Sequence, residues 1–142
     1  MINTKTDMIN EALSWYGTPF GPGAIKGKSC SCTGLLAGIA RNMGLERLTK
    51  EFSKYEYHVK PEDARMLILK LRDILQLGDP NNIGLLDVIV VKTKHNWHHV
   101  GLVLRNNNVI ESSEKHKRVI YSRLNYKPSL ILKVQEIQNW PD

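Results

Sequence analysis

The sequence predicts an α+β fold, with helices in the first half of the chain packed on a mainly antiparallel sheet of about five strands. Apolar residues up to about position 76 recur at the three- and four-residue spacing of amphipathic helices. The second half instead contains short β-branched runs separated by turn residues. Helices followed by strands, rather than alternating with them, favour an antiparallel sheet.

Helix signals mark three segments of the N-terminal half. Thr6 or Asp7 is placed to cap the first helix, because short polar side chains accept hydrogen bonds from exposed N–H groups at a helix start. Gly44 is a plausible stop for the second, since glycine adopts the left-handed conformation that ends many helices. The expected helices span residues 6–16, 33–43 and 61–76.

Strand signals follow the turn-rich segment 78–82. The asparagine run 106–108 separates two of the expected strands and predicts a tight hairpin. The expected strands contain residues 88–91, 100–104, 109–110, 119–121 and 130–134.

Composition sets limits on the function. A chain of 142 residues is most simply one domain, residues 1–142, and a net charge of +6 favours anionic partners in general. The basic residues are scattered and no zinc-finger or arginine-rich motif is present, so nucleic acid is not specifically indicated. No run of 18 apolar residues predicts a membrane span, and the N-terminus lacks the apolar core of a secretory signal.

The two cysteines, Cys30 and Cys32, lie in one glycine-rich segment. A disulfide between residues two apart is strained, so both are expected as free thiols of a protein made in a reducing compartment. Cys32 falls at the expected start of the second helix, where the helix dipole favours a thiolate, the nucleophilic form of cysteine. Cys32 is therefore the candidate nucleophile. Cys30 is the rival, and a buried core cysteine is the alternative for either.

A cysteine nucleophile needs a base, and His99 is the best placed of five histidines. It begins a strand on which His99, Gly101 and Val103 share one face by alternation. Gly101 is expected to leave space beside the imidazole for a cysteine from a packed helix.

Glu111 is the candidate for the group that orients His99, and the hairpin loop decides whether it can do so. With a two-residue loop, position 99 pairs with 114 and Glu111 faces away. With a three-residue loop, position 99 pairs with 113, and Glu111 becomes a diagonal neighbour of His99, about 7–8 Å away between backbones. Asparagine tolerates the left-handed residue that such a loop needs. The alternative is that Glu111 is an ordinary exposed strand residue.

These motifs, in this order, resemble the NlpC-like cysteine peptidases of cell-wall remodelling, and the resemblance covers about residues 8–134. The Trp15 and Tyr55 segments look most similar to the small phage-associated branch of that family. The matching segments are Gly17-Thr-Pro-Phe20, Ser31-Cys-Thr-Gly-Leu35, Leu86-Asp-Val-Ile-Val90, His99-Val-Gly-Leu102 and Val109-Ile-Glu111.

The resemblance implies a papain-like core without cofactor, which hydrolyses an amide bond of a peptidoglycan stem peptide next to D-γ-glutamyl through a thioester. Cys32 is then the nucleophile, His99 the base and Glu111 the residue that orients it. Lacking a secretory signal, such a protein would reach the wall on a phage tail, through a secretion system or by lysis.

Four positions depart from the family pattern. Ser31 stands in place of aspartate, but its hydroxyl can still cap the helix. Phe20 stands in place of tyrosine and lacks a phenolic hydroxyl. Leu86 replaces a glycine, and Glu111 is less usual than histidine, asparagine or glutamine.

Other interpretations remain open. Segment 95–99 contains three histidines, which suggests a metal site. His98 and His99 would point to opposite faces of an extended strand, however, and this disfavours zinc. Trp97 lines a substrate groove or covers the core, and Phe20, Ser31, Cys30, His98 and Trp97 are the candidate site-lining residues. The function alternatives are a papain-like acyltransferase or thioesterase, and a catalytically degenerate phage-tail or wall-binding module.

Overall fold

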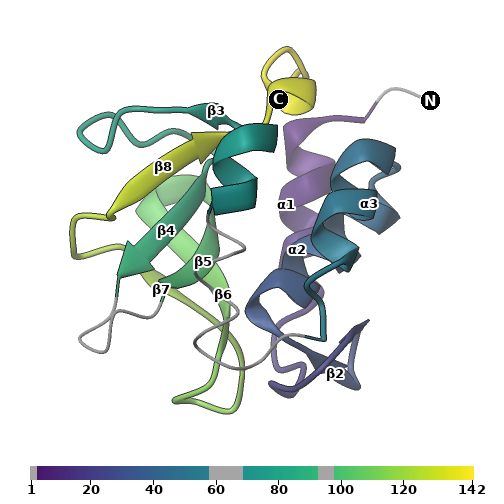
Figure 1. The fold of residues 1–142 in the computed structure, drawn as a ribbon. Coiled ribbons are helices and arrows are strands. Elements are labelled where there is room, and N and C mark those ends of the chain that lie inside the picture. Colours follow the sequence, from purple (N-terminus) through teal and green to yellow (C-terminus); the bar gives the residue numbers. More distant parts are fainter. Residues whose placement is uncertain (1–2, 58–68, 93–97) are drawn as a thin grey trace.

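The computed structural model describes residues 3–57, 69–92 and 98–142. It has an α+β fold in which helices lie on one side of a six-stranded sheet, as Figure 1 shows. The helices are α1 (Lys5–Leu13), α2 (Cys32–Asn42) and α3 (Glu46–Ser53), and residues 69–74 are also helical. Within the described residues, no helix is both long and apolar enough to cross a bilayer.

The sheet is antiparallel throughout, in the order β3-β8-β4-β5-β6-β7. The five expected strands are all present, so the predicted fold class is confirmed. A short sixth strand adds an edge, and β1 and β2 form a separate hairpin before α2. The strands are β1 (Ala24–Ile25), β2 (Ser29–Cys30), β3 (Gln76–Leu77), β4 (Val88–Lys92), β5 (His98–Val103), β6 (Asn108–Ser113), β7 (Arg118–Arg123) and β8 (Leu130–Lys133), with 3-10 turns η1 (Arg105–Asn107) and η2 (Gln135–Ile137).

The helix boundaries differ from the expected ones at three points. The first helix begins one residue earlier than expected and ends three residues earlier, at Leu13; its cap is Thr4, which forms a capping box with Asp7, rather than Thr6 or Asp7. Gln76 lies in strand β3 rather than at the end of a helix, and the first half of the expected helix 61–76, residues 61–68, falls outside the described residues. Helix α3 was not expected, because only Leu48 and Phe52 of its eight residues are buried.

Trp15 fixes the packing of α1 against α2. Its ring is buried and lies over Gly38 of α2, where an added Cβ would come within 2.2 Å of the ring. The indole N–H donates to the Glu11 carboxylate at 2.6 Å, so the one polar atom of the ring is satisfied. This expected core residue therefore anchors α2, the helix that carries Cys32.

Two apolar layers cover the two faces of the sheet. The larger core joins the helices to one face, and includes Val100, Leu102 and Ile110. A smaller cluster covers the opposite face, which we call the outer face, and contains Ile89, Val103, Val109 and Ile131 with Ile83, Val91 and Leu124 packed against it.

Candidate active site

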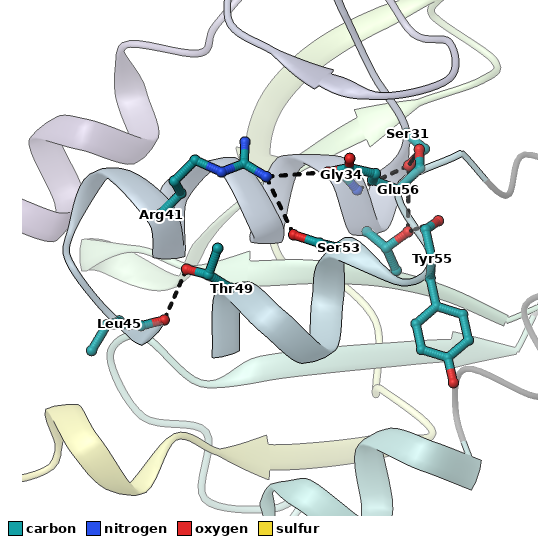
Figure 2. A network of polar contacts seen from close by, with 9 residues as sticks. Ser31, Gly34, Arg41, Leu45, Thr49, Ser53, Tyr55 and Glu56 are labelled. Carbon is teal, nitrogen blue, oxygen red and sulfur yellow. Dashed lines mark hydrogen bonds and ion pairs between the residues drawn. The ribbon is translucent and has the colours of Figure 1, made fainter. Parts of the chain in front are cut away.

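Cys32 is the first residue of α2, and Ser31 is its N-cap, as expected. The fully buried Ser31 hydroxyl accepts a hydrogen bond from the Gly34 N–H at 2.9 Å and donates one to the Glu56 carbonyl at 2.8 Å (Figure 2). One hydroxyl thus satisfies a helix-start donor and binds the helix to the segment after α3. Ser31 fixes where the Cys32 backbone lies.

The loop before α2 also contacts the start of the helix. The Ser31 N–H donates to the Gly23 carbonyl at 3.2 Å, and the Gly23 N–H donates to Glu56 at 2.8 Å. A Cβ at Gly34 would lie 1.9 Å from the Gly23 carbonyl oxygen, closer than any side chain tolerates. Glycine is therefore required two residues after Cys32 because another backbone crosses the helix there.

Side chains of α2 extend this network to α3. Thr33 donates to the Tyr55 carbonyl at 2.8 Å. Arg41 reaches Ser53 at 3.2 Å and the Glu56 carboxylate at 3.4 Å (Figure 2). The turn after α3 is consequently joined to both ends of the helix that carries the candidate nucleophile.

The hairpin between β5 and β6 has the three-residue loop, which is the one that brings His99 and Glu111 to the same face. Leu102 pairs with Ile110 and Val103 with Val109, so the loop is Arg105–Asn107 and the extrapolated partner of His99 is Ser113. Asn106 and Asn107 adopt φ values of 58° and 59°, the left-handed conformation expected of asparagine.

The Nε2 atom of His99 lies 3.4 Å from Oε2 of Glu111. This nitrogen is buried and has no hydrogen-bond partner among the described residues. A charge-assisted hydrogen bond at full strength measures about 2.7–2.9 Å, so the pair has room to shorten.

Electrostatics couple Cys32, His99 and Glu111. Burial alone would lower the pKa of the His99 imidazole, but its interactions with Cys32 and Glu111 outweigh burial and raise that pKa to about 10. Burial would raise the pKa of Glu111, yet the nearby His99 imidazole and the charge of His116 lower it. At neutral pH the imidazole is therefore protonated and the carboxylate ionised.

The expected role of Gly101 is wrong. An added Cβ at Gly101 would lie 2.7 Å from the Val109 side chain and 3.3 Å from the Ile110 carbonyl. Val109, rather than a cysteine from a helix, occupies the space beside this glycine. Gly101 allows β5 and β6 to approach each other just above the histidine.

Cys30 is fully buried on β2. Its thiol contacts the Ser112 hydroxyl at 3.6 Å, and that hydroxyl donates to the Cys30 carbonyl at 2.7 Å. Burial raises the pKa of the Cys30 thiol to about 11, against the lowering effect of Ser112. Both cysteines are free thiols, but Cys30 is not exposed to line a substrate groove.

The structure describes only some of the remaining predicted site residues. Phe20 is partly buried, and its backbone bridges to Cys30 and donates to the Lys117 carbonyl. Trp97 and His95 lie outside the described residues, and of His98 only the backbone in β5 is described. In the described part of the chain, no group of three His, Cys, Asp or Glu side chains could hold a metal ion.

Three residues near the site had no signal in the sequence. Ser112 joins β6 to Cys30, His116 acts on Glu111 through its charge, and Tyr126 interacts with the Glu111 charge from the β7–β8 connection. Each of the three belongs to a polar stretch without a motif. They come near the site only because the sheet brings their segments to it.

A thiol at a helix start, with an imidazole and a carboxylate from neighbouring strands, is the arrangement of a papain-like cysteine hydrolase. No protein-family model and no curated protein matches the sequence. Solved structures do match the fold, over more than nine tenths of this chain.

Three of these structures are informative. The NlpC/p60 domain of the peptidoglycan hydrolase SagA matches with a TM-score of 0.63 and 11% identity over 93% of this chain and 100% of that domain. The peptidoglycan hydrolase RipB of Mycobacterium tuberculosis gives 0.59 and 15%, over 92% of this chain and 63% of RipB. RipD of the same organism, a non-catalytic NlpC/p60 domain protein adapted to peptidoglycan binding, gives 0.57 and 16%, over 93% and 98%. This chain therefore has the NlpC/p60 fold, as the sequence motifs predicted.

Proposed function

We propose that this protein is a cysteine peptidase that hydrolyses an amide bond of a peptidoglycan stem peptide, next to D-γ-glutamyl. The observation that carries the proposal is the coupling of His99 to both Cys32 and Glu111 on an NlpC/p60 fold. RipD shows that the fold alone does not imply catalysis. The presence of thiol, imidazole and carboxylate together is what favours an enzyme here.

In the proposed mechanism, the Cys32 sulfur attacks the amide carbon and forms a tetrahedral oxyanion. The backbone N–H of Cys32, at the positive end of α2, is placed to stabilise that charge. His99 then gives its proton to the leaving nitrogen as the C–N bond breaks, which leaves a thioester. Water attacks the thioester while His99 takes a proton from it, and collapse releases the acid and the Cys32 thiolate beside the protonated His99, which restores the starting state. Glu111 stabilises the imidazolium form of His99.

The test is cleavage of purified muropeptides, followed by mass spectrometry of the products. The wild type is expected to release a new amine terminus, and Cys32→Ala is expected to release none. Cys30→Ala is the matched control, because this buried thiol is outside the proposed chemistry. Equal cleavage by Cys32→Ala would exclude the mechanism. Binding of wild-type protein to sacculi without cleavage would instead favour a wall-binding function like that of RipD.

Delivery by a phage tail or a secretion system, and membership of the phage-associated branch, remain proposals. They would be supported by co-purification of the protein with phage particles or with secretion machinery from its native cells. The net charge of +6 fits approach to an anionic wall, whichever carrier is used.

A further inference from the structure

The connection between β7 and β8 crosses the outer face of the sheet. At its start, the Leu124 N–H donates to the Asn107 carbonyl at 2.7 Å, and the Leu124 side chain packs on the outer cluster with Val109. At its end, the Ser129 N–H donates to the Val90 carbonyl at 2.8 Å. Because these anchors lie at the β5–β6 loop and on β4, the segment between them passes over β6 and β5.

Glu111 lies on that same face. It pairs with Ile120 of β7 and is two residues from Val109, so alternation places its side chain on the outer side. Tyr126 is in the middle of the crossing segment, and its side chain interacts with the Glu111 charge. Burial, and then the negative charge of Glu111, raise the pKa of the Tyr126 phenol. The tyrosine is thus close to the carboxylate and neutral at physiological pH.

Tyr126 is 43% exposed, whereas the Glu111 side chain is only 21% exposed. The Glu111 side chain is therefore largely shielded from water, and it lies on the face that the crossing segment passes over. A charge–charge interaction strengthens as water is removed, because the effective dielectric constant falls. The charged or titratable groups that act on the pair are Cys32 from α2, His116 from the β6–β7 turn and Tyr126.

We propose that Tyr126 is a positioning residue, whose ring covers the Glu111 carboxylate, keeps water from it and so strengthens its hold on the protonated His99 imidazole. Its effect on catalysis rests on the proposed function, but its effect on His99 does not. A neutral ring over the carboxylate excludes water without competing for the imidazole.

The experiment is an NMR titration of the His99 imidazole in Tyr126→Ala, Tyr126→Phe and Tyr126→Leu. Loss of the ring in Tyr126→Ala is expected to lower the pKa of His99 by about one unit, a size within the usual spread of histidine pKa values in folded proteins. Phe and Leu keep an apolar cover and are expected to retain most of the wild-type value. Tyr121→Ala is the matched control. Tyr121 is an exposed tyrosine on β7, and its ring contacts that of Tyr16.

The proposal is overturned if folded Tyr126→Ala titrates like the wild type, or if Tyr121→Ala shifts His99 equally. A fall in the pKa of His99 that is as large in Tyr126→Phe as in Tyr126→Ala would also overturn the proposal. The hydroxyl, rather than the ring that covers the carboxylate, would then be responsible. Because the readout needs no substrate, an inactive protein that shows the expected shift would refute the proposed function alone. In an active protein, the alkaline limit of cleavage is expected to move to lower pH in Tyr126→Ala.

Discussion

Cys32 and the His99–Glu111 pair are held in place in different ways. The start of α2 is fixed by hydrogen bonds that join Ser31, Gly23 and Glu56, all of them inside the protein (Figure 2). His99 and Glu111 depend instead on strand register and one ion pair of 3.4 Å. The backbone of the candidate nucleophile, Cys32, is therefore fixed by several hydrogen bonds, whereas the candidate base, His99, has room to adjust. Changes near Ser31 are expected to affect stability first, and changes at Glu111 chemistry first.

The largest expected effect is loss of activity in Glu111→Gln. The amide keeps the shape of the side chain but cannot stabilise the imidazolium, and removing the carboxylate of a related triad costs about 10⁴-fold in kcat. We expect a fall of about 10²–10⁴-fold in muropeptide cleavage, with the fold retained in circular dichroism spectra. A variant that unfolds, rather than losing activity, would show that the sheet region is structural like the helix region.

The same variant has a pH signature in stability. The raised pKa of His99 contributes stability that is complete below the ordinary value of 6.5 and is lost as pH rises to about 10. The lowered pKa of Glu111 contributes stability that is present above the ordinary 4.5 and is lost on acidification. The difference in free energy of unfolding between wild type and Glu111→Gln is therefore expected to peak between these two ordinary values. Urea denaturation at several pH values would measure it, and a flat difference would contradict the coupling.

Gly34→Ala is expected to produce the largest loss of stability. Its Cβ would overlap the Gly23 carbonyl oxygen, so two backbone segments must separate. Overpacking of this kind costs about 1–3 kcal/mol, and Cys32 would move with the helix start. Gly84→Ala is a suitable control, because its Cβ would meet atoms no nearer than 3.3 Å. Equal denaturation midpoints for the two variants would contradict the tight contact.

Ser31→Ala is expected to cost about 1–2 kcal/mol, because the Gly34 N–H and the Glu56 carbonyl lose their shared partner. Ser31→Asp, which restores the residue typical of the family, is expected to destabilise as well. A carboxylate cannot donate to the Glu56 carbonyl, and burying its charge is costly. Thermal denaturation would rank the three proteins, and a stabilised Ser31→Asp would show that the pocket can rearrange.

The smallest effect is expected for Arg41→Ala. The Arg41 side chain is exposed, and its contact with Glu56 is an ion pair in solvent. Such pairs contribute within about 0.5 kcal/mol. A loss above that size in denaturant unfolding would mean that the side-chain part of the α2–α3 network matters as much as its backbone part.

The sequence alone predicted the elements whose signals are local. The start of α2 at Cys32, the Ser31 cap and the stop at Gly44 follow from short-range capping preferences. The asparagines of η1 are compatible with the three-residue loop that places Glu111 beside His99, but the sequence left a two-residue loop open, and the strand pairing decided between them. Alternation and turn chemistry act within a few residues, so they can be read before any packing is known.

Tertiary packing decided what those signals leave open. Helix α3 is mostly polar and buries only two side chains, so too few apolar residues marked it in the sequence. Leu86, where the related motif has glycine, adopts a left-handed φ of 65° while fully buried, with its N–H donating to Val103. Burial offsets a backbone cost that local propensity would forbid.

The same reason explains the surroundings of the site. Contacts between segments far apart in the chain decide three features of the site. They place Val109 in the space at Gly101, join the buried Cys30 to Ser112, and bring Tyr126 near Glu111. The sequence determined which groups are chemically competent, because that depends on residue type and local conformation. The tertiary structure determined which of them meet, how far water is excluded and which charge states follow.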